Sequence, residues 1–457
     1  MTTIDAPARG WRAGPLANRN FQLLAAGQLT STVGDLCYAV ALPWLVLAGH
    51  GSPALLGTVL ACYGVPRTVL IPVGGMLVDK IGSRAIMLTT DIARCALVAV
   101  LVVAAIEQTA SLVLLAPVAA LLGAGEGAFL PASFTIMPAL LPPGQLAAGN
   151  GLSTAATQMG QLAGPVLGGV LVAAAGSAPA FAVDAATFGV SALTLAFIRV
   201  ARTAAAGPGG PASTAAPAGP AAPAGLSTPA DPDPPASPGT PASTGNAAAP
   251  ADNLLQLVRR ERLLQVILGL AMIANVAFAG AFEVALPALA HASFGAGGYG
   301  ALVACIGAGG VLGTLAATRG NRLSRPAVTS CLTFVVQGLA AALVPFLGGL
   351  PGACGAAFAI GICNGFANIV MITLLQQWAP PALLGRVMSL IMLAAMGMFP
   401  VSVAVSGVAV REFGPRPFFP VAGAVLGVAA LLALTQRVLR AFGQASQNPA
   451  AQPAEAT

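Results

Sequence analysis

The stretch GMLVDKIGSR, residues 75–84, decides the fold class because it places a short polar turn between two long apolar segments. The flanking segments, 54–78 and 84–106, are each long enough to cross a bilayer as a helix, which takes about 20 apolar residues. A turn this short therefore indicates two consecutive membrane spans that run in opposite directions. The turn holds one carboxylate and two cations close together, which suggests a latch between helices rather than a passive connection.

The whole chain has the composition of a membrane protein. Hydrophobic residues make up 57% of its 457 residues and charged residues 7%, whereas a soluble domain carries about 25% charged residues. So few charges cannot cover a water-exposed surface, and most of the surface must face lipid. Apolar runs predict an all-α protein with twelve transmembrane helices, at 21–48, 54–78, 84–106, 110–137, 147–174, 178–199, 263–290, 297–318, 326–348, 352–378, 385–410 and 417–438.

The basic residues predict the orientation of these helices. With the N-terminus in the cytoplasm, sixteen of the 20 Lys and Arg residues fall on the cytoplasmic side, and only Arg411 and Arg416 fall outside. This follows the positive-inside rule, and it gives the net charge of +6 a role in topology and none in nucleic-acid binding. We expect a multi-pass protein of a bacterial plasma membrane with both termini in the cytoplasm.

A segment without membrane-span character divides the chain. Residues 203–252 are nearly all Ala, Pro, Gly, Ser and Thr, a composition that cannot form a packed core. The expected domains are cytoplasmic tails at 1–20 and 441–457, six-helix bundles at 21–200 and 254–440, and a disordered cytoplasmic linker at 201–253.

The two predicted bundles repeat each other weakly. The tetrapeptide VALP at 40–43 recurs at 284–287, and further glycines, prolines and small residues match at a nearly constant offset. Parallel repeats of this kind place a substrate site between the halves at mid-membrane. At matching positions Arg67 corresponds to Gly310, and Glu126 corresponds to Asn364, so functional asymmetry between the halves is expected there.

The 75–84 stretch reads G-x-x-x-D-K-x-G-x-R, which resembles the loop signature between helices 2 and 3 of the major facilitator superfamily. The resemblance implies a transporter of two parallel six-helix repeats. It also implies a latch that stabilises the outward-open state by clamping helix 2 to helix 11, which begins here at 385–389. Ordinary topology-setting charges are the alternative reading. The latch residues predicted in this way are Gly75, Asp79, Lys80, Gly82, Arg84, Asp91, Arg94 and Arg386, with Asp91 and Arg94 expected to pair along one helix.

A second motif lies in the fifth predicted helix and consists of Gly160, Gly164, Pro165, Gly168 and Gly169. Small residues four apart make a flat face for close helix contact, and the proline bends the helix. The motif resembles the one that marks antiporters in the superfamily, and generic small-residue packing is the alternative. The whole pattern is similar to the drug:proton antiporter branch, which includes macrolide and siderophore exporters.

Ionisable residues within predicted membrane spans usually face a cavity or a partner, since a charge at the bilayer centre costs about 2.5–3.5 kcal/mol on insertion scales. Asp35 and Arg67 lie at similar depths at a rise of about 1.5 Å per residue, and an ion pair between them is the leading hypothesis. Asn364 and Asn368 share one helix face and either line the cavity or bond between helices. The candidates for proton coupling or substrate binding are Asp35, Arg67, Glu126, Glu283, Asn364 and Asn368.

Catalytic and cofactor chemistry is not expected. The seven cysteines have no metal-ligand spacing, and the chain has neither a phosphate-binding loop nor a nucleophile–base arrangement. We expect no enzyme activity, no metal and no cofactor. The expected function is proton-coupled export of a small amphipathic compound by a monomer, with the substrate, protons and the lipid bilayer as partners. A facilitator or importer of the same fold is one alternative, and a non-transporting receptor or scaffold is the other.

Overall fold

The computed structural model describes residues 14–49, 51–198, 258–319, 325–378 and 384–441, and every regular element in these ranges is helical. The predicted linker at 201–253 lies outside the described residues, as does most of both predicted tails. The first half contains η2 (Pro15–Ala17), α1 (Arg19–Ala48), α2 (Pro53–Ile81), α3 (Ser83–Ile106), α4 (Leu112–Leu140), η3 (Pro143–Gln145), α5 (Leu146–Ala175) and α6 (Ser177–Phe197). The second half contains α8 (Arg262–Ala279), the π-helix η4 (Gly280–Ala285), α9 (Leu286–Ser293), α10 (Gly295–Arg319), α11 (Pro326–Leu343), α12 (Leu350–Trp378), α13 (Leu384–Gly397), α14 (Phe399–Phe413), α15 (Pro415–Thr435) and α16 (Arg437–Ala441).

Eleven helical segments in the described ranges are long and apolar enough to cross a membrane. The segment 262–293 is one of them and combines α8, η4 and α9. The remaining predicted span, 385–410, corresponds to α13 and α14 together, which are separated at Met398. Pro400 stands at the start of α14, and a proline that begins a helix supplies no N–H to the preceding turn. The prediction of an all-helical membrane protein is confirmed.

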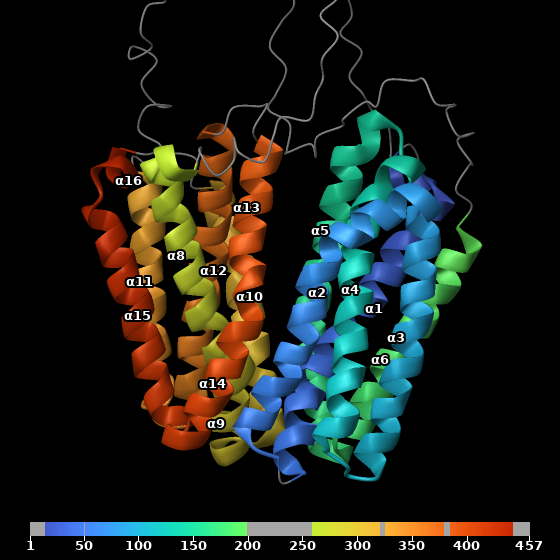
Figure 1. The fold of residues 1–457 in the computed structure, drawn as a ribbon, viewed down its shortest axis with the longest axis horizontal. Helices are drawn as coiled ribbons and strands as arrows, with labels where there is room; N and C mark the ends of the chain where they lie inside the picture. The colour runs from blue at the N-terminus through green and yellow to red at the C-terminus, as the bar shows by residue number, and fades with distance from the viewer. Residues whose placement is uncertain (1–13, 50, 199–257, 320–324, 379–383, 442–457) are drawn as a thin grey trace, which may run out of the picture.

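The helices form two groups that approach each other at one end (Figure 1). Helices α1 to α6 make the first group, and α8 to α15 make the second. Between the groups, Gly57 of α2 lies against Gly407 of α14, and Gly169 of α5 lies against Gly300 of α10. These paired glycines let backbones touch, as small residues do in membrane helix packing. We call this the closed end.

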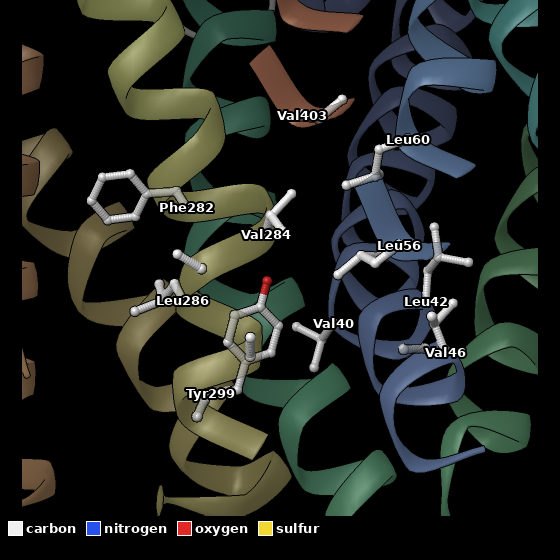
Figure 2. Packing of buried hydrophobic residues seen from close by; sticks show 14 of the residues in the cluster. Val40, Leu42, Val46, Leu56, Leu60, Phe282, Val284, Leu286, Tyr299 and Val403 are labelled. Carbon is white, nitrogen blue, oxygen red and sulfur yellow. The ribbon is translucent and has the colours of Figure 1, made fainter. Parts of the chain in front are cut away.

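Apolar side chains from both groups fill the closed end. Figure 2 shows Val40 and Leu56 from the first group opposite Val284 and Tyr299 from the second, all of them buried in one cluster. At the surface of this end, the Trp44 ring of α1 lies 4.9 Å from the His291 ring of α9, centroid to centroid. A continuous apolar core therefore joins the two groups here.

At the opposite end, where α6 finishes and α8 begins, the two groups diverge (Figure 1). A side chain added at Gly75, near the end of α2, or at Gly151, near the start of α5, would meet nothing within 4 Å. The first group is tied together here by Asn18, whose side chain caps α1 and donates 2.7 Å to the Leu140 carbonyl of α4. We call this the open end.

The glycine contact between α5 and α10 should control the closed end. A Cβ atom at Gly300 would lie 2.7 Å from the Gly169 Cα atom, so Gly300→Leu must push the two backbones apart. We expect a severalfold lower yield of thiol cross-linking between Trp44→Cys and His291→Cys, measured in a protein whose native cysteines are replaced by alanine. Gly269→Leu is the matched control, because a Cβ atom at Gly269 meets open space. Equal yields in the two variants would contradict this account of the closed end.

Candidate functional site

A cavity of about 230 Å³ lies between the two helix groups, and six acidic and basic side chains line it. We call it the charged cavity. Its walls come from α1, α2, α3, α4 and α6 of the first group and from η4 and α14 of the second. The ionisable residues that line it are Asp35, Arg67, Arg94, Glu126, Asp184 and Glu283.

An ion pair between α2 and α4 crosses this cavity. Arg67 Nη2 lies 3.0 Å from Glu126 Oε1, and the two side chains are 21% and 27% exposed. The guanidinium also lies over the Tyr63 ring, 5.9 Å from its centroid. The predicted Asp35–Arg67 ion pair is therefore wrong, since Arg67 has Glu126 as its acidic partner in the described structure.

Two glycines of α4 explain this pairing. A Cβ atom at Gly123 would collide with the Tyr63 carbonyl of α2, and one at Gly127 would lie 2.5 Å from the Arg67 carbonyl. The backbones of α2 and α4 therefore touch on both sides of Glu126, and its carboxylate reaches the arginine on the facing helix. The sequence held this signal in the spacing Gly-x-x-x-Gly around Glu126.

Asp35 lines the same cavity with an accessible side chain and has no ionic partner among the described residues. Its neighbour Gly34 makes room for a second carboxylate, because a Cβ atom at Gly34 would lie 2.6 Å from Asp184 Oδ1. Asp184 is buried on α6, and its Oδ1 atom has no hydrogen-bond partner in the described structure. Two carboxylates thus face the cavity beside the Arg67–Glu126 pair.

Glu283 comes from the second group and is placed by an irregular backbone. It lies within the π-helix η4, where the chain makes i→i+5 hydrogen bonds and the helix takes one more residue per turn. This changes the direction of the side chains relative to α8, and Glu283 lines the charged cavity. The sequence identified Glu283 as a candidate because it is a charged residue within a predicted span, but a run of apolar residues gives no sign of a π-helix.

Arg94 and Asp91 do not form the predicted intrahelical pair. The Asp91 Oδ2 atom accepts a hydrogen bond of 2.6 Å from the Ser191 hydroxyl of α6. Arg94 instead lies between two rings, with its guanidinium carbon 5.3 Å from the Phe129 centroid and 5.4 Å from the Phe188 centroid. Its Nη2 atom is buried without a hydrogen-bond partner in the described structure. Arg94 belongs to the wall of the charged cavity.

Asp184, Tyr38 and Tyr63 also line the charged cavity, although none of them was among the predicted site residues. Tyr38 lies three residues after Asp35, and Tyr63 lies four residues before Arg67, so both tyrosines share a helix face with a predicted site residue. That spacing could have identified them. Asp184 lies within the predicted span 178–199, and its charge was a signal there, but its position near the outer end of that span indicated a helix cap or an ionic partner instead of a cavity residue.

The predicted latch lies at the open end. Gly82 joins α2 to α3 at a φ of +85°, a conformation that suits glycine. Arg84 donates hydrogen bonds of 2.8 and 2.7 Å to the Leu195 and Ala196 carbonyls, and it thereby caps the end of α6. Asp79 and Lys80 are exposed.

Two latch predictions have separate outcomes. Gly75 makes no close helix contact in this conformation, since a Cβ atom there meets nothing within 4 Å, whereas one at Gly74 would meet Ala128, Pro131 and the Gly127 carbonyl of α4. Arg386 lies in α13, and its side chain is outside the described part of the structure.

The glycines predicted in the fifth helix lie at helix contacts. Gly160, Gly164 and Gly168 of α5 pack on α1 at Thr32, Leu36 and Cys37, and a Cβ atom at any of them would lie within 3 Å of that helix. Gly169 faces α10 of the second group, and Pro165 lies inside α5 between these contacts. Helix α5 therefore contacts α1 of its own group on one face and α10 of the second group on a neighbouring face.

Asn364 and Asn368 lie in a different cavity, of about 420 Å³, between α8, α11, α12 and α13. We call it the amide cavity. Asn275 and Gln337 also line it, and its remaining walls are Ala, Leu, Ile, Phe and Met side chains. The predicted candidates thus separate into an ionisable set in one cavity and an amide pair in the other.

Comparison with known proteins places this geometry in a family. The model of the Major Facilitator Superfamily matches residues 24–399. The multidrug efflux pump Tap of Mycolicibacterium fortuitum is 32% identical over 197 residues, which are 41% of this chain and 46% of the pump. The alignment thus spans less than half of that curated relative. An uncharacterised MFS-type transporter of Sinorhizobium fredii, y4rN, is 26% identical over 91% of this chain and 94% of its own length.

Solved structures share the fold at low sequence identity. A mutant of the nucleoside transporter NupG superposes with a TM-score of 0.67 at 12% identity, over 92% of this chain and 99% of that one. A bacterial homologue of the iron transporter ferroportin, in its inward-facing state, superposes with a TM-score of 0.64 at 14% identity, over 91% and 98% of the two chains.

The Arg67–Glu126 pair should be energetically coupled. We expect Arg67→Gln and Glu126→Gln each to lower the apparent melting temperature of the detergent-purified protein, because each leaves a charge in the cavity without its counter-ion. The double variant should lose less stability than the sum of the losses in the two single variants. The coupling should be about 1 kcal/mol, since both side chains are about a quarter exposed and partly screened.

The control for this cycle is the Arg411–Glu412 pair at the closed end, where the two charged atoms are 3.8 Å apart and both side chains are about 60% exposed. An exposed pair of this kind contributes little, so its double variant should show additive losses. Additivity at Arg67 and Glu126 as well would show that their contact does not stabilise the protein.

Proposed function

This chain belongs to the Major Facilitator Superfamily, and we propose that within this superfamily of secondary transporters it exports a small amphipathic compound in exchange for protons. The observation that carries the proposal is the Arg67–Glu126 ion pair, held in a cavity between the two helix groups together with Asp35, Asp184 and Glu283. Carboxylates inside a membrane protein commonly serve as proton carriers.

The charge distribution supports a cytoplasmic position for the open end. Basic residues occur at helix ends there, whereas Arg411 and Arg416 are at the closed end. The positive-inside rule then orients the open end toward the cytoplasm, with both termini on that side. In this orientation the protein is a multi-pass plasma-membrane transporter in the conformation that takes up an outgoing compound. The basic residues of the open end include Arg19, Lys80, Arg84, Arg262, Arg325 and Arg437.

Proton binding would act on the ion pair. When Glu126 takes up a proton, Arg67 loses its counter-ion and attracts another carboxylate of the cavity, for which Asp35 is available because it has no ionic partner among the described residues. Since α1, α2 and α4 carry these three groups, the exchange changes the forces between helices of the first group. A ligand or proton that binds one conformation better shifts the equilibrium between conformations.

Two observations favour export over import. The chain is 32% identical, over less than half of each protein, to a multidrug efflux pump. The glycines and proline of α5 resemble the motif that marks antiporters in the superfamily. The compound class proposed on this basis is that of drugs, antibiotics or siderophores, carried by a monomer. A facilitator of the same fold would move solute without a proton gradient.

The coupling can be tested with Asp35→Asn and Glu126→Gln. A substrate is first found by comparing drug and dye accumulation in cells with and without the protein. In proteoliposomes with an imposed pH gradient, both variants should lose most gradient-driven accumulation of that substrate and keep its exchange in the absence of a gradient, because the binding of solute does not require the missing proton site. Glu107→Gln, outside the cavity at the end of α3, is the control.

Unchanged gradient-driven accumulation in both variants would show that these carboxylates do not couple transport to the proton gradient. Transport by the native protein that ignores every imposed proton gradient would favour the facilitator instead.

The latch is tested by Asp79→Asn. Asp79 is exposed and has no partner among the described residues, so the variant should keep the melting temperature of the purified protein. Transport should fall severalfold, because the resemblance assigns Asp79 to the opposite, outward-open conformation, where it would accept hydrogen bonds from another helix end. Glu412→Gln at the closed end should affect neither quantity. Normal transport in Asp79→Asn would leave its charge with a topological role only.

A further inference from the structure

We propose that the amide cavity is a binding site for an uncharged ligand that carries at least one N–H or O–H group. This inference rests on the proposed function only for the direction in which the ligand moves. The cavity has four amide side chains, and no ionisable residue is among the described residues that line it. All four come from the second helix group, whereas the charged cavity lies mainly against the first.

The two cavities differ in volume, and this difference indicates which of them can hold a drug-sized ligand. Pockets for drug-sized molecules occupy about 300–1,000 Å³. The amide cavity, at about 420 Å³, falls within this range, whereas the charged cavity, at about 230 Å³, falls below it. In the conformation described here, the larger ligand space is therefore the one without charges.

The side chain of Gln337 offers a hydrogen-bond acceptor to a polar group in this cavity. Its side chain on α11 is 3% exposed and lines the cavity, and its Oε1 atom has no hydrogen-bond partner in the described structure. A buried acceptor without a partner is unfavourable, and a ligand N–H or O–H would satisfy it. Buried polar groups without partners are uncommon enough to call for an explanation.

The three asparagines of the amide cavity can also form hydrogen bonds with a ligand. Asn275 donates 2.9 Å to the Ala271 carbonyl of its own helix, which leaves its Oδ1 atom available as an acceptor. Asn364 and Asn368 have no side-chain hydrogen bond in the described structure and lie one turn apart on α12. Each amide can both donate and accept. The site can therefore bind hydroxyl, amide and carbonyl groups.

No charged side chain is among the described residues that line the cavity, and this favours an uncharged ligand. An ion that enters an apolar cavity loses its hydration, and neutral amides replace only part of it. Phe334 and Met371 offer apolar surface instead, and methionine adapts to differently shaped molecules. An uncharged aromatic amide or alcohol fits this lining, and the cationic form of the same molecule does not.

The position of the cavity allows loading from the open end. Its residues lie on α8 and α13, which start at that end, and on the part of α12 that finishes there. Asn368 and Ile372 of α12 are exposed, so the cavity is accessible from outside the helix group that forms it. Toward the closed end the apolar core of Figure 2 blocks further passage.

The test uses pairs of aromatic compounds in which one member is an uncharged amide and the other is the cationic amine that remains when the acyl group is removed. Chloramphenicol and its deacylated amine form one such pair. Binding to the detergent-purified full chain is measured by equilibrium dialysis and by the shift in melting temperature. We expect uncharged members to bind and their cationic partners to bind at least about tenfold more weakly, as expected for an uncompensated charge.

Two substitutions at one position locate the site. Gln337→Leu should weaken binding of the uncharged members by about tenfold, the effect of one lost hydrogen bond to a buried group. Gln337→Glu supplies a counter-ion and should reverse the preference toward the cationic partners. Ser330→Ala is the control on the same helix, because the Ser330 hydroxyl is also buried and unpartnered but is not part of the cavity lining.

Preference of the native protein for the cationic members would overturn the ligand class, and so would a failure of every uncharged member to bind. Equal binding by native protein, Gln337→Leu and Gln337→Glu would overturn the location. The assay contains no gradient, so failure here leaves proton-coupled export intact with a substrate site elsewhere. Transport by the native protein that ignores every proton gradient, together with normal ligand binding, would instead overturn the proposed function and leave this site in place.

Discussion

The cost of removing a charge from water governs the arrangement of this protein. An arginine or aspartate at the centre of a membrane helix costs about 2.5–3.5 kcal/mol on insertion scales, and the described spans place six ionisable side chains around one cavity. There, Arg67 forms an ion pair with Glu126, and the accessible side chain of Asp35 faces the cavity instead of lipid. Glycines on both sides of Glu126 let the backbones of α2 and α4 touch, and the ion pair lies at this contact.

Most of the fold could be predicted from the sequence because membrane insertion is decided by local composition. A run of about 20 apolar residues spans a bilayer whatever its neighbours are, and the twelve predicted spans correspond to α1–α6, α8–η4–α9, α10, α11, α12, α13–α14 and α15. The interruptions within spans could not be predicted in this way. The π-helix at η4 and the break at Met398 depend on which backbone hydrogen bonds packing preserves.

The site was predicted less completely, because sequence gives depth in the membrane but not the rotation of a helix. Asp35 and Arg67 do lie at similar depth, and both line the charged cavity. The partner of Arg67 was decided by the approach of α4, which brings Glu126 to 3.0 Å. Arg94 was assigned to the latch from its distance to the open end, yet the face it occupies on α3 turns it toward Phe129, Phe188 and the cavity.

The two cavities are lined in part by corresponding positions of the internal repeat, but the side chains at these positions differ in chemistry. Glu126 of the first half corresponds to Asn364 of the second, and one lines the charged cavity while the other lines the amide cavity. Two segments connect these spaces: α8 carries Asn275 and continues through η4 to Glu283, and α13 carries Met396 and continues past Met398 to Phe399. In both segments the regular helix is interrupted between the cavities, where helices bend most readily. A ligand bound among the amides, as we propose, and a change of charge at the carboxylates would therefore act on the same two segments, from opposite sides of the helix interruptions.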